Sequence, residues 1–317
     1  MTSTDEQLTR FRYAGPVDVD TYGEYRIAQS AGDTRPLYRF AGRITTDGSS
    51  GFAAEPGRYH LYSGWFCPWA QRTVIVRALL GLEDVVSLSY VHGRRDGRGW
   101  AFREPTGPDP VNGFTLLRQA YEATEPGFDG HVSVPTLWDR RTGTVVSNTF
   151  GQITIDLATQ FEGWARPGTS TYPEPLRAEI DALSERMLVT VNHGVAVAAG
   201  RGDQAYSARE TLLNTLNELD ERLAVTRYLH GDTVTESDVR LWVTLVRYDV
   251  NSNADGAIGP RRLIDYPHLW AYARDLFQQP AFRDSTDFTS FAKPGAVSAH
   301  RAVVAGWDAP HGRGPAD

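Results

Sequence analysis

The chain has 317 residues, of which 41% are hydrophobic and 22% are charged, a balance that allows a sizeable core and room for two domains. Its net charge of −7 argues against a nucleic-acid binder, because phosphate recognition needs a basic face. The N-terminus, MTSTDEQLTR, lacks the apolar stretch of a signal peptide, and the longest apolar run, VAVAA, is far shorter than a membrane span of roughly 18–20 residues.

Cys67 is the only cysteine of the chain. A single thiol excludes an internal disulfide and a zinc cage built of cysteines, and it suits a reducing cytoplasm, where we expect this protein. The histidines show no H-E-x-x-H spacing, and the sequence has neither a G-x-S-x-G elbow nor a P-loop. We therefore expect no metal, no nucleic acid and no membrane among its partners.

The first half of the chain combines strand and helix patterns. Residues 1–57 are polar with scattered aromatic residues, and we interpret them as an N-terminal extension that packs on the surface or is only partly ordered. After them, alternating segments predict strands at 58–62, 85–91, 131–139 and 144–148, and helical spacing predicts helices at 67–81, 114–123 and 150–161.

The second half is almost entirely helical. It follows a polar, proline-bearing linker, WARPGTSTYPEP at 164–175. Helices are expected at 176–199, 207–224, 236–250 and 266–279, and TESD at 235–238 resembles a capping box that starts the third of these. The sequence thus predicts an α/β thioredoxin-like domain at 58–163, an all-α domain at 164–290 and a surface tail at 291–317.

Cys67 stands at the expected start of the helix 67–81. The first amides of a helix have no intrahelical acceptor, so a thiolate is stabilised there, and its pKa can fall from about 8.5 to about 3.5–7.5. Pro68 is compatible with the first helical position, and Arg72 adds positive charge one turn later. The alternative is a buried structural cysteine, which the loop-to-helix position disfavours. Any disulfide of Cys67 must form with a small thiol or another molecule.

Pro135 supports a reactive Cys67. In thioredoxin-like proteins a Val-cis-Pro pair lies beside the active cysteine and offers backbone groups to an incoming thiol, and SVPT at 133–136 fits that position. The alternative is an ordinary trans proline at the edge of the sheet, since only about 5–6% of X–Pro bonds are cis. We expect the cis form.

Several longer segments resemble one known family. They are GRYHLYSGWFCPWAQRTVIVRALLGLEDVVSLSYVH, GW at 99–100, VPTLWDRRTGTVVSN and RYLHGDTVTESDVRLWVTLVRYD. Together they are similar to the glutathionyl-hydroquinone reductases, the xi class of the glutathione transferase superfamily, over residues 35–290. The resemblance implies the glutathione transferase fold, a homodimer, and reduction of glutathionyl-hydroquinones.

The resemblance also implies roles for residues. Cys67 would attack the sulfur of the conjugate, Trp100 would pack on the thiol cofactor, and Val134, next to Pro135, would pair its backbone with the cysteinyl part of that cofactor. We assign Trp65 and Phe66, the aromatic residues before Cys67, to the pocket for the aromatic substrate. A structural role as core or cover is the alternative for Trp100.

The sequence departs from the family where the thiol and the substrate are recognised. The family reads N-E-S-S after the last strand, with Glu and Ser on the γ-glutamyl group, whereas Thr149 and Phe150 stand here. Two family tyrosines of the helical domain are replaced by Ala196 and Ser252, and His193 is either a new substrate contact or an ordinary polar helix residue. The small thiol is therefore glutathione or a substitute such as mycothiol.

One compositional feature favours the substitute. All but one of the 32 Lys and Arg residues are arginine, Lys293 being the exception, and this bias is typical of a high-GC bacterial genome. Two alternatives remain open. One is a specialised enzyme of secondary metabolism that makes or breaks a C–S bond on this scaffold. The other is a non-catalytic ligand-binding relative in which Cys67 is a relic.

Overall fold

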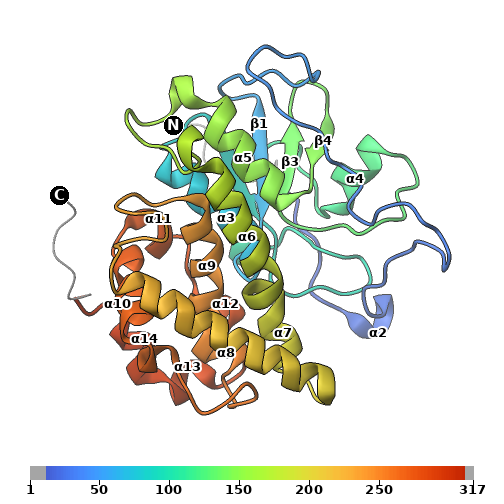
Figure 1. The fold of residues 1–317 in the computed structure, drawn as a ribbon. Helices are drawn as coiled ribbons and strands as arrows, with labels where there is room; N and C mark the ends of the chain where they lie inside the picture. The colour runs from blue at the N-terminus through green and yellow to red at the C-terminus, as the bar shows by residue number, and fades with distance from the viewer. Residues whose placement is uncertain (1–11, 311–317) are drawn as a thin grey trace, which may run out of the picture. The chain divides into compact units, whose positions relative to one another are not determined.

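The computed structural model describes residues 12–310. The chain divides into two compact units, Met1–Pro167 and Gly168–Asp317, whose boundary falls within the proline-bearing segment 164–175 (Figure 1). Among the described residues, no helix is both long enough and apolar enough to span a membrane.

The first unit is built on a four-stranded mixed sheet. Its strands are β1 (Tyr59–Ser63), β2 (Val86–Tyr90), β3 (Thr136–Asp139) and β4 (Thr144–Ser147), in the order β2-β1-β3-β4. Strand β2 is parallel to β1, and β3 and β4 are antiparallel to their neighbours. The parallel pair needs a crossover connection, which helix α3 (Pro68–Leu79) supplies. Helices α4 (Arg118–Thr124) and α5 (Phe150–Gln160) complete the thioredoxin-like arrangement predicted from the sequence.

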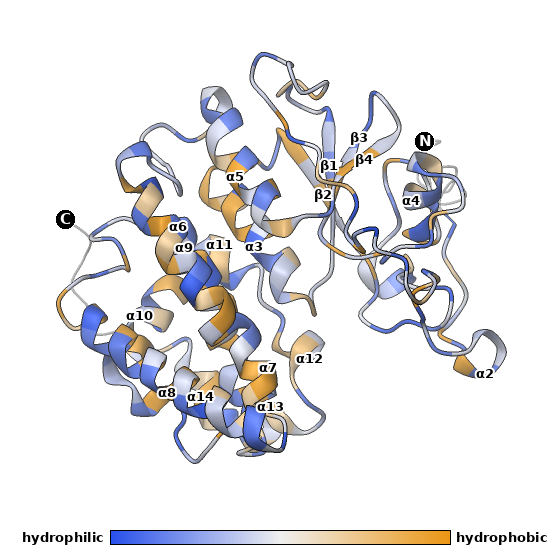
Figure 2. Cartoon of the chain, turned by 45° about the vertical axis from the view of Figure 1, so that its right-hand side comes forward, coloured by the Kyte–Doolittle hydropathy of each residue, from blue (hydrophilic) through white to orange (hydrophobic). Residues whose placement is uncertain are grey.

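Strand β1 is buried along its whole length, although it carries both hydrophobic and polar residues. Strongly hydrophobic residues of this unit lie on helix α5 as well as on the strands (Figure 2). His60 is fully buried on β1 and is satisfied by two hydroxyls of β2: Nδ1 lies 2.7 Å from Ser87 Oγ and Nε2 lies 2.8 Å from Ser89 Oγ. Burial lowers the pKa of His60 from 6.5 to about 3, so the ring is neutral in the folded protein.

We predict that His60 makes the protein sensitive to mild acid. Between pH 3 and pH 6.5, His60 binds a proton in the unfolded chain but not in the folded chain. The contribution of neutral His60 to the free energy of unfolding is therefore fully present above pH 6.5 and is lost as the pH falls. From pH 7 to pH 5 this one group should lower the free energy of unfolding by about 2 kcal/mol. Denaturant unfolding of His60→Gln should lack that decline, whereas the half-buried His92→Gln should retain it. Equal pH dependence of the two variants would contradict this account.

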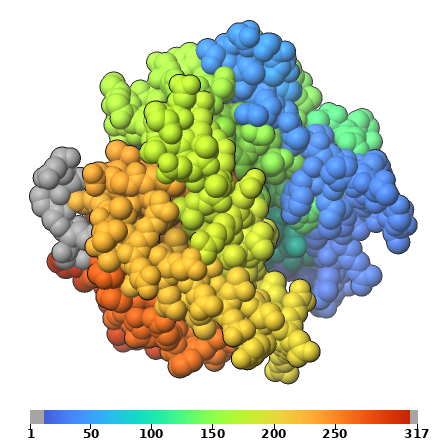
Figure 3. Space-filling view, viewed as in Figure 1, coloured from blue at the N-terminus to red at the C-terminus, as the bar shows by residue number. Residues whose placement is uncertain are grey.

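A third element of the first unit is the N-terminal arm, residues 12–57, which includes the short helix α2 (Val19–Tyr22). The arm runs beside β4, where Gly42 N donates to Val146 O at 2.9 Å and a Cβ on Gly42 would lie 2.6 Å from that oxygen. This approach is too close for any residue but glycine. Figure 3 shows the arm, in blue, lying directly on the green part of its own unit. The predicted extension is therefore packed on the surface over residues 12–57, while residues 1–11 lie outside the described part.

Two arginines fix the arm to the loop after α4. Arg39 forms ion pairs with Glu125 at 2.7 Å and with Asp129, and Arg35 reaches Asp129 at 2.7 Å. The Arg39 side chain is only 9% exposed, so its ion pairs are less screened by solvent than those of ordinary surface residues. Backbone hydrogen bonds and ion pairs together thus hold the arm in place.

The second unit is helical. Its principal helices are α6 (Arg177–Met187), α7 (Gly194–Ala198), α8 (Asp203–Leu223), α9 (Glu236–Arg247) and α10 (Pro267–Phe277), with α11 (Pro280–Arg283), α12 (Phe288–Phe291), α13 (Ala296–Ala299) and α14 (Arg301–Gly306) near its end. The predicted capping box is confirmed, because Thr235 N donates to the Asp238 carboxylate at 2.7 Å and the Thr235 side chain accepts from the Asp238 backbone. Short 3-10 turns lie at Glu174–Leu176 and Leu263–Asp265 in this unit and at Glu104–Thr106 and Glu162–Trp164 in the first unit.

Two predictions for this unit need correction. The expected single helix 176–199 is interrupted by a π-helical stretch, Leu188–His193, and α9 continues into a second one, Tyr248–Ser252. A π turn adds one residue to a helix without changing its hydrophobic character, so the periodicity does not reveal it.

The described part of the tail, 291–310, is not merely a surface segment. Trp307 is 2% exposed, and its ring lies 5.0 Å from that of Trp270 and 6.2 Å from that of Trp242.

Candidate active site around Cys67

Cys67 is the N-cap residue of α3, as the sequence predicts. Its backbone is extended, its carbonyl accepts from Gln71 N at 3.0 Å, and Pro68 occupies the first helical position. The amides of the first turn have no acceptor within the helix, and the positive end of the helix dipole lies at the same point. The position therefore favours a negative charge on sulfur.

The surroundings of Cys67 are largely apolar. The residue is 8% exposed and belongs to a buried cluster with Ala70, Val134 and Tyr121. Its Sγ lies 3.5 Å from Val134 O, close enough for the thiol to donate a weak hydrogen bond. Apolar burial raises a thiol pKa whereas a helix N-terminus lowers it, so the site sets two effects against each other.

The peptide bond between Val134 and Pro135 is cis, as predicted. The predicted strand 131–139 is shorter than expected, because β3 begins only at Thr136. Pro135 has no N–H for a ladder hydrogen bond, so the preceding residues leave the sheet and form the loop that faces Cys67. This loop brings Val134 and Pro135 to the sulfur.

Thr149 and Phe150 are at the start of α5, where Phe150 packs against α3. Thr149 is the N-cap residue, and its Oγ1 reaches Phe40 O at 3.5 Å. The Phe150 ring lies 4.7 Å from the ring of Trp69, and the Arg72 guanidinium lies 4.5 Å from Trp69 and 5.2 Å from Phe150. Phe150 thus packs against aromatic and cationic groups, and neither residue offers a carboxylate.

Phe66 and Trp65, the aromatic residues before Cys67, each stack on another ring. Phe66 lies 4.3 Å from Trp100, and Trp65 lies 4.3 Å from Tyr90 at the end of β2. Such pairs contribute about 0.5–1.5 kcal/mol beyond simple burial. The stack on Phe66 places Trp100 beside the apolar cluster that contains Cys67.

Four residues near the site were not predicted from the sequence. The Arg95 guanidinium lies over Trp100 at 4.3 Å and over Tyr25 of the arm at 4.1 Å. Tyr25 Oη lies 3.2 Å from His131 Nδ1, and the His131 ring lies 5.5 Å from that of Tyr38. The available signal was the number of tyrosines in the N-terminal extension, whose rings can form contacts of this kind.

The arm residue Tyr38 lies within electrostatic range of the sulfur. Partial burial raises the pKa of Tyr38, and a thiolate at Cys67 adds to that effect. His131 N also donates to Leu37 O at 3.1 Å, which fixes the arm at this point. The arm therefore contributes to the surroundings of Cys67.

We predict that Gly97→Ala loosens the arm. A Cβ on Gly97 would lie 2.0 Å from Tyr22 O, so the α2 segment must move away, and the bond from Gly97 N to Gly23 O at 2.7 Å must break. Trypsin cleavage within the arm should become at least about tenfold faster, because cleavage tracks local opening. Gly93→Ala is the matched control, since its Cβ meets only Phe66 at an ordinary 3.5 Å. Equal cleavage of both variants would show that the arm is not held at this point.

The remaining predicted residues belong to the helical unit. His193 ends the first π-helical stretch and is exposed, Ala196 is exposed on α7, and Ser252 ends the second π-helical stretch and is partly buried. Interruptions of this kind are frequent at functional sites. The assignment of these three residues to a substrate pocket stays a prediction.

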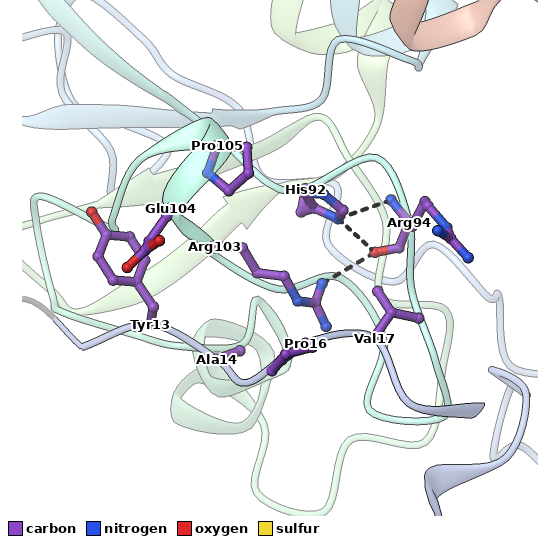
Figure 4. A pocket seen from close by; sticks show the side chains of 9 residues that line it. All are labelled: Tyr13, Ala14, Pro16, Val17, His92, Arg94, Arg103, Glu104 and Pro105. Atoms are coloured by element: carbon purple, nitrogen blue, oxygen red, sulfur yellow. Dashed lines mark hydrogen bonds between the residues drawn. The ribbon is translucent and has the colours of Figure 1, made fainter. Parts of the chain in front are cut away.

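A separate pocket of about 560 Å³ lies between the arm and the loop after β2 (Figure 4). Arg103 crosses this boundary: its Nε donates to Gly15 O at 2.9 Å and its Nη1 to Arg94 O at 3.1 Å. The lining residues are Tyr13, Ala14, Pro16, Val17, His92, Arg94, Arg103, Glu104 and Pro105. None of them is a predicted site residue, so we interpret this pocket as part of the contact between the arm and the loop after β2.

Within residues 12–310, no group of three or more His, Cys, Asp or Glu side chains could hold a metal ion.

Comparisons with known proteins agree with this architecture. Residues 66–150 match the family described as glutathione S-transferase, N-terminal domain, and residues 175–275 match glutathione S-transferase, C-terminal domain. The glutathionyl-hydroquinone reductase PcpF of Sphingobium chlorophenolicum is 40% identical over 69% of this chain and 72% of its own length. The glutathionyl-hydroquinone reductase YqjG of Escherichia coli is 35% identical over 84% and 85%, respectively.

Solved structures are similar over comparable lengths. A glutathione transferase from Gordonia bronchialis is 43% identical, with a TM-score of 0.78 over 86% of this chain and 89% of that chain. The glutathione-bound structure of YqjG is 33% identical, with a TM-score of 0.78 over 88% and 98%. The xi glutathione transferase from Phanerochaete chrysosporium is 34% identical, with a TM-score of 0.76 over 89% and 98%. With a cysteine at the start of α3 and both transferase domains present, the chain belongs to the glutathionyl-hydroquinone reductases, the xi class of the glutathione transferase superfamily, and is a thiol-dependent reductase.

Proposed function

We propose that this enzyme cleaves thiol conjugates of hydroquinone-like aromatics through a mixed disulfide on Cys67, and that its thiol is mycothiol or another small thiol in place of glutathione. The observation that carries the proposal is the position of Cys67. It caps α3, faces the cis Val134–Pro135 bond, and is the only cysteine of the chain. A single nucleophile of this kind suits thiol exchange with an external partner.

The proposed reaction has two balanced steps. In the first, the Cys67 thiolate attacks the sulfur of the conjugate, a disulfide forms, the C–S bond breaks, and the aromatic carbon leaves with the electron pair and takes a proton. In the second, a thiolate of the small thiol attacks the mixed disulfide, releases the small-molecule disulfide and regenerates the Cys67 thiolate. The carbon gains two electrons, one formally from the sulfur of the conjugate and one from the sulfur of the external thiol, and these two sulfurs are joined in the released disulfide.

The start of α5 supports a changed thiol. Recognition of a γ-glutamyl amino group calls for a carboxylate, and Thr149 and Phe150 supply none. The Phe150 ring instead packs on Trp69 beneath the Arg72 guanidinium. A site built to hydrogen-bond a polar group of its ligand discriminates strongly against ligands that lack this group. When the protein loses the residue that binds the group, this preference is reversed. Mycothiol has no γ-glutamyl group and needs no such carboxylate.

The test compares thiols on matched conjugates. A quinone conjugate of mycothiol with mycothiol as reductant should be turned over faster than the glutathione conjugate with glutathione. The effect should appear mainly in kcat/KM, because the pocket contacts differ. Equal absence of turnover with both thiols at neutral pH would overturn the proposal.

We also propose that the enzyme works in the cytoplasm as a homodimer. A catalytic thiol that must return to its reduced form needs a reducing compartment, and the chain has no second cysteine to protect it as an internal disulfide. Sedimentation equilibrium at micromolar concentration should give twice the 35.1 kDa mass of the chain.

A further inference from the structure

Arg95 is a partly buried cation that the described structure leaves without a carboxylate. Its guanidinium lies between two rings, 4.1 Å from the centre of Tyr25 and 4.3 Å from that of Trp100. Within residues 12–310, its buried Nη1 has no hydrogen-bond partner and no Asp or Glu forms an ion pair with it. Burial lowers the pKa of Arg95, and only the Tyr25 hydroxyl opposes that effect.

The carboxylate that follows Arg95 in the sequence is already engaged. Asp96 is fully buried, pairs with Arg98 at 2.7 Å and with Arg103 at 3.7 Å, and accepts a bond from Asp18 N at 3.0 Å. The aromatic faces offset part of the desolvation of Arg95, by about 0.5–2 kcal/mol each. Both rings contact the guanidinium, but its buried Nη1 has no hydrogen-bond partner among the described residues, which is costly for a buried charge.

Arg95 is connected to both loops that carry the candidate active site. Trp100, on one face, stacks on Phe66, the residue before Cys67. Tyr25, on the other face, contacts His131 Nδ1 at 3.2 Å and accepts from Val132 N at 3.1 Å, two residues before Val134. The charge of Arg95 also lowers the pKa of His131, after burial, so a neutral imidazole lies beside the cation.

We propose that Arg95 is an anion-binding residue of the Cys67 site, and that the conjugate attacked by Cys67 carries a carboxylate that the edge of this guanidinium binds. The proposal rests on the proposed function and adds a substrate class to it. A carboxylate on the thiol part and one on the aromatic part would form the same charge-assisted hydrogen bonds. The experiment below distinguishes these two sources.

The experiment uses disulfides in matched pairs as probes for the intact enzyme. The aliphatic pair is dithiodipropionate, with carboxylates, and dithiodiethanol, which is neutral. The aromatic pair is dithiobis(nitrobenzoate), with carboxylates, and dithiodipyridine. In each reaction the Cys67 thiolate attacks one sulfur, a mixed disulfide forms, and the other sulfur leaves as a thiolate with the electron pair. Intact-mass measurement gives the rate, and the rate with the charged probe is divided by that with the neutral probe.

In Arg95→Gln this ratio should fall about tenfold for at least one pair, since a charge-assisted hydrogen bond contributes about 1.5–3 kcal/mol. A fall for the aliphatic pair places the carboxylate on the thiol and excludes mycothiol, which has none, in favour of another small thiol. A fall for the aromatic pair alone places the carboxylate on the aromatic part. Arg95→Lys, which keeps the charge, should retain most of the ratio. Arg94→Gln is the matched control, because it removes the same charge from the adjacent, exposed residue and should change the ratio less than about twofold.

If folded Arg95→Gln shows unchanged charged-to-neutral rate ratios for both pairs, the inference is overturned. Arg95 would then have only a structural role, in contact with Tyr25 and Trp100. Reaction with the neutral probes checks that each variant still presents its thiol. If the wild-type Cys67 fails to react even with neutral disulfides at neutral pH, the proposed function fails, and this inference with it. The two failures are therefore distinguishable.

Discussion

Cys67→Ser is expected to lower turnover of aryl thioether conjugates by at least about 10³-fold, the largest effect of any single change in this protein. The hydroxyl of serine is not ionised at neutral pH, even at a helix N-terminus, and an oxygen cannot form the mixed disulfide. The change is small in volume, and a hydroxyl at this position can still donate to Val134 O, which lies 3.5 Å from Sγ. Turnover should be followed by release of the aromatic product.

The fold of this variant should be nearly unchanged. Unfolding by denaturant should show a loss of no more than about 1 kcal/mol, because one buried polar atom replaces another that has the same partner. Turnover above a tenth of the wild-type rate would mean that the sulfur of Cys67 does not take part in bond cleavage, and would favour the interpretation of Cys67 as a relic.

The second large effect is a gain of function. Thr149→Glu combined with Phe150→Ser restores the residue types that hold a γ-glutamyl group in the family, and should raise kcat/KM for glutathione at least about tenfold. The new carboxylate stands at the N-terminus of α5, where the helix dipole stabilises it. Kinetics with glutathione and mycothiol, each with its own conjugate, measure the change in preference.

The control for this swap is Thr149→Gln with Phe150→Ser, which removes the phenyl ring in the same way but adds no charge. Both variants uncover Trp69 and Arg72, which now pack on Phe150, and both should lose similar stability. If the neutral control gains as much glutathione activity as the charged variant, the missing carboxylate is not the reason for altered thiol recognition.

The position of Cys67 could be predicted because it depends on local chemistry. Pro68 at the first helical position and the apolar spacing that follows define the start of α3 without any tertiary information. The cis bond before Pro135 was expected because SVPT at 133–136 matches the Val-cis-Pro pair of thioredoxin-like proteins, and it is confirmed. The capping box of Thr235 and Asp238 is another local pattern, and it too is confirmed.

The contacts of the arm could not be predicted, because they join residues far apart in the chain. Tyr25 meets His131 across more than a hundred residues, and Arg95 needs both the arm and Trp100 to be enclosed. No periodicity encodes such pairs. The burial of Trp307 was missed for the same reason, since the six-residue helix α14 before it is too short for a helical period to reveal its partners.

The most direct test of the account is the rate of alkylation of Cys67 as a function of pH. Because Cys67 is the only cysteine of the chain, the mass of the intact protein reports on this residue alone. The first-turn amides of α3 predict that the thiolate is already present near pH 6, so the rate with iodoacetamide should be almost constant from about pH 6 to pH 9. A slow rate that rises with an apparent pKa of about 8.5 would contradict the account, because it would mean that apolar burial outweighs the helix terminus at this sulfur.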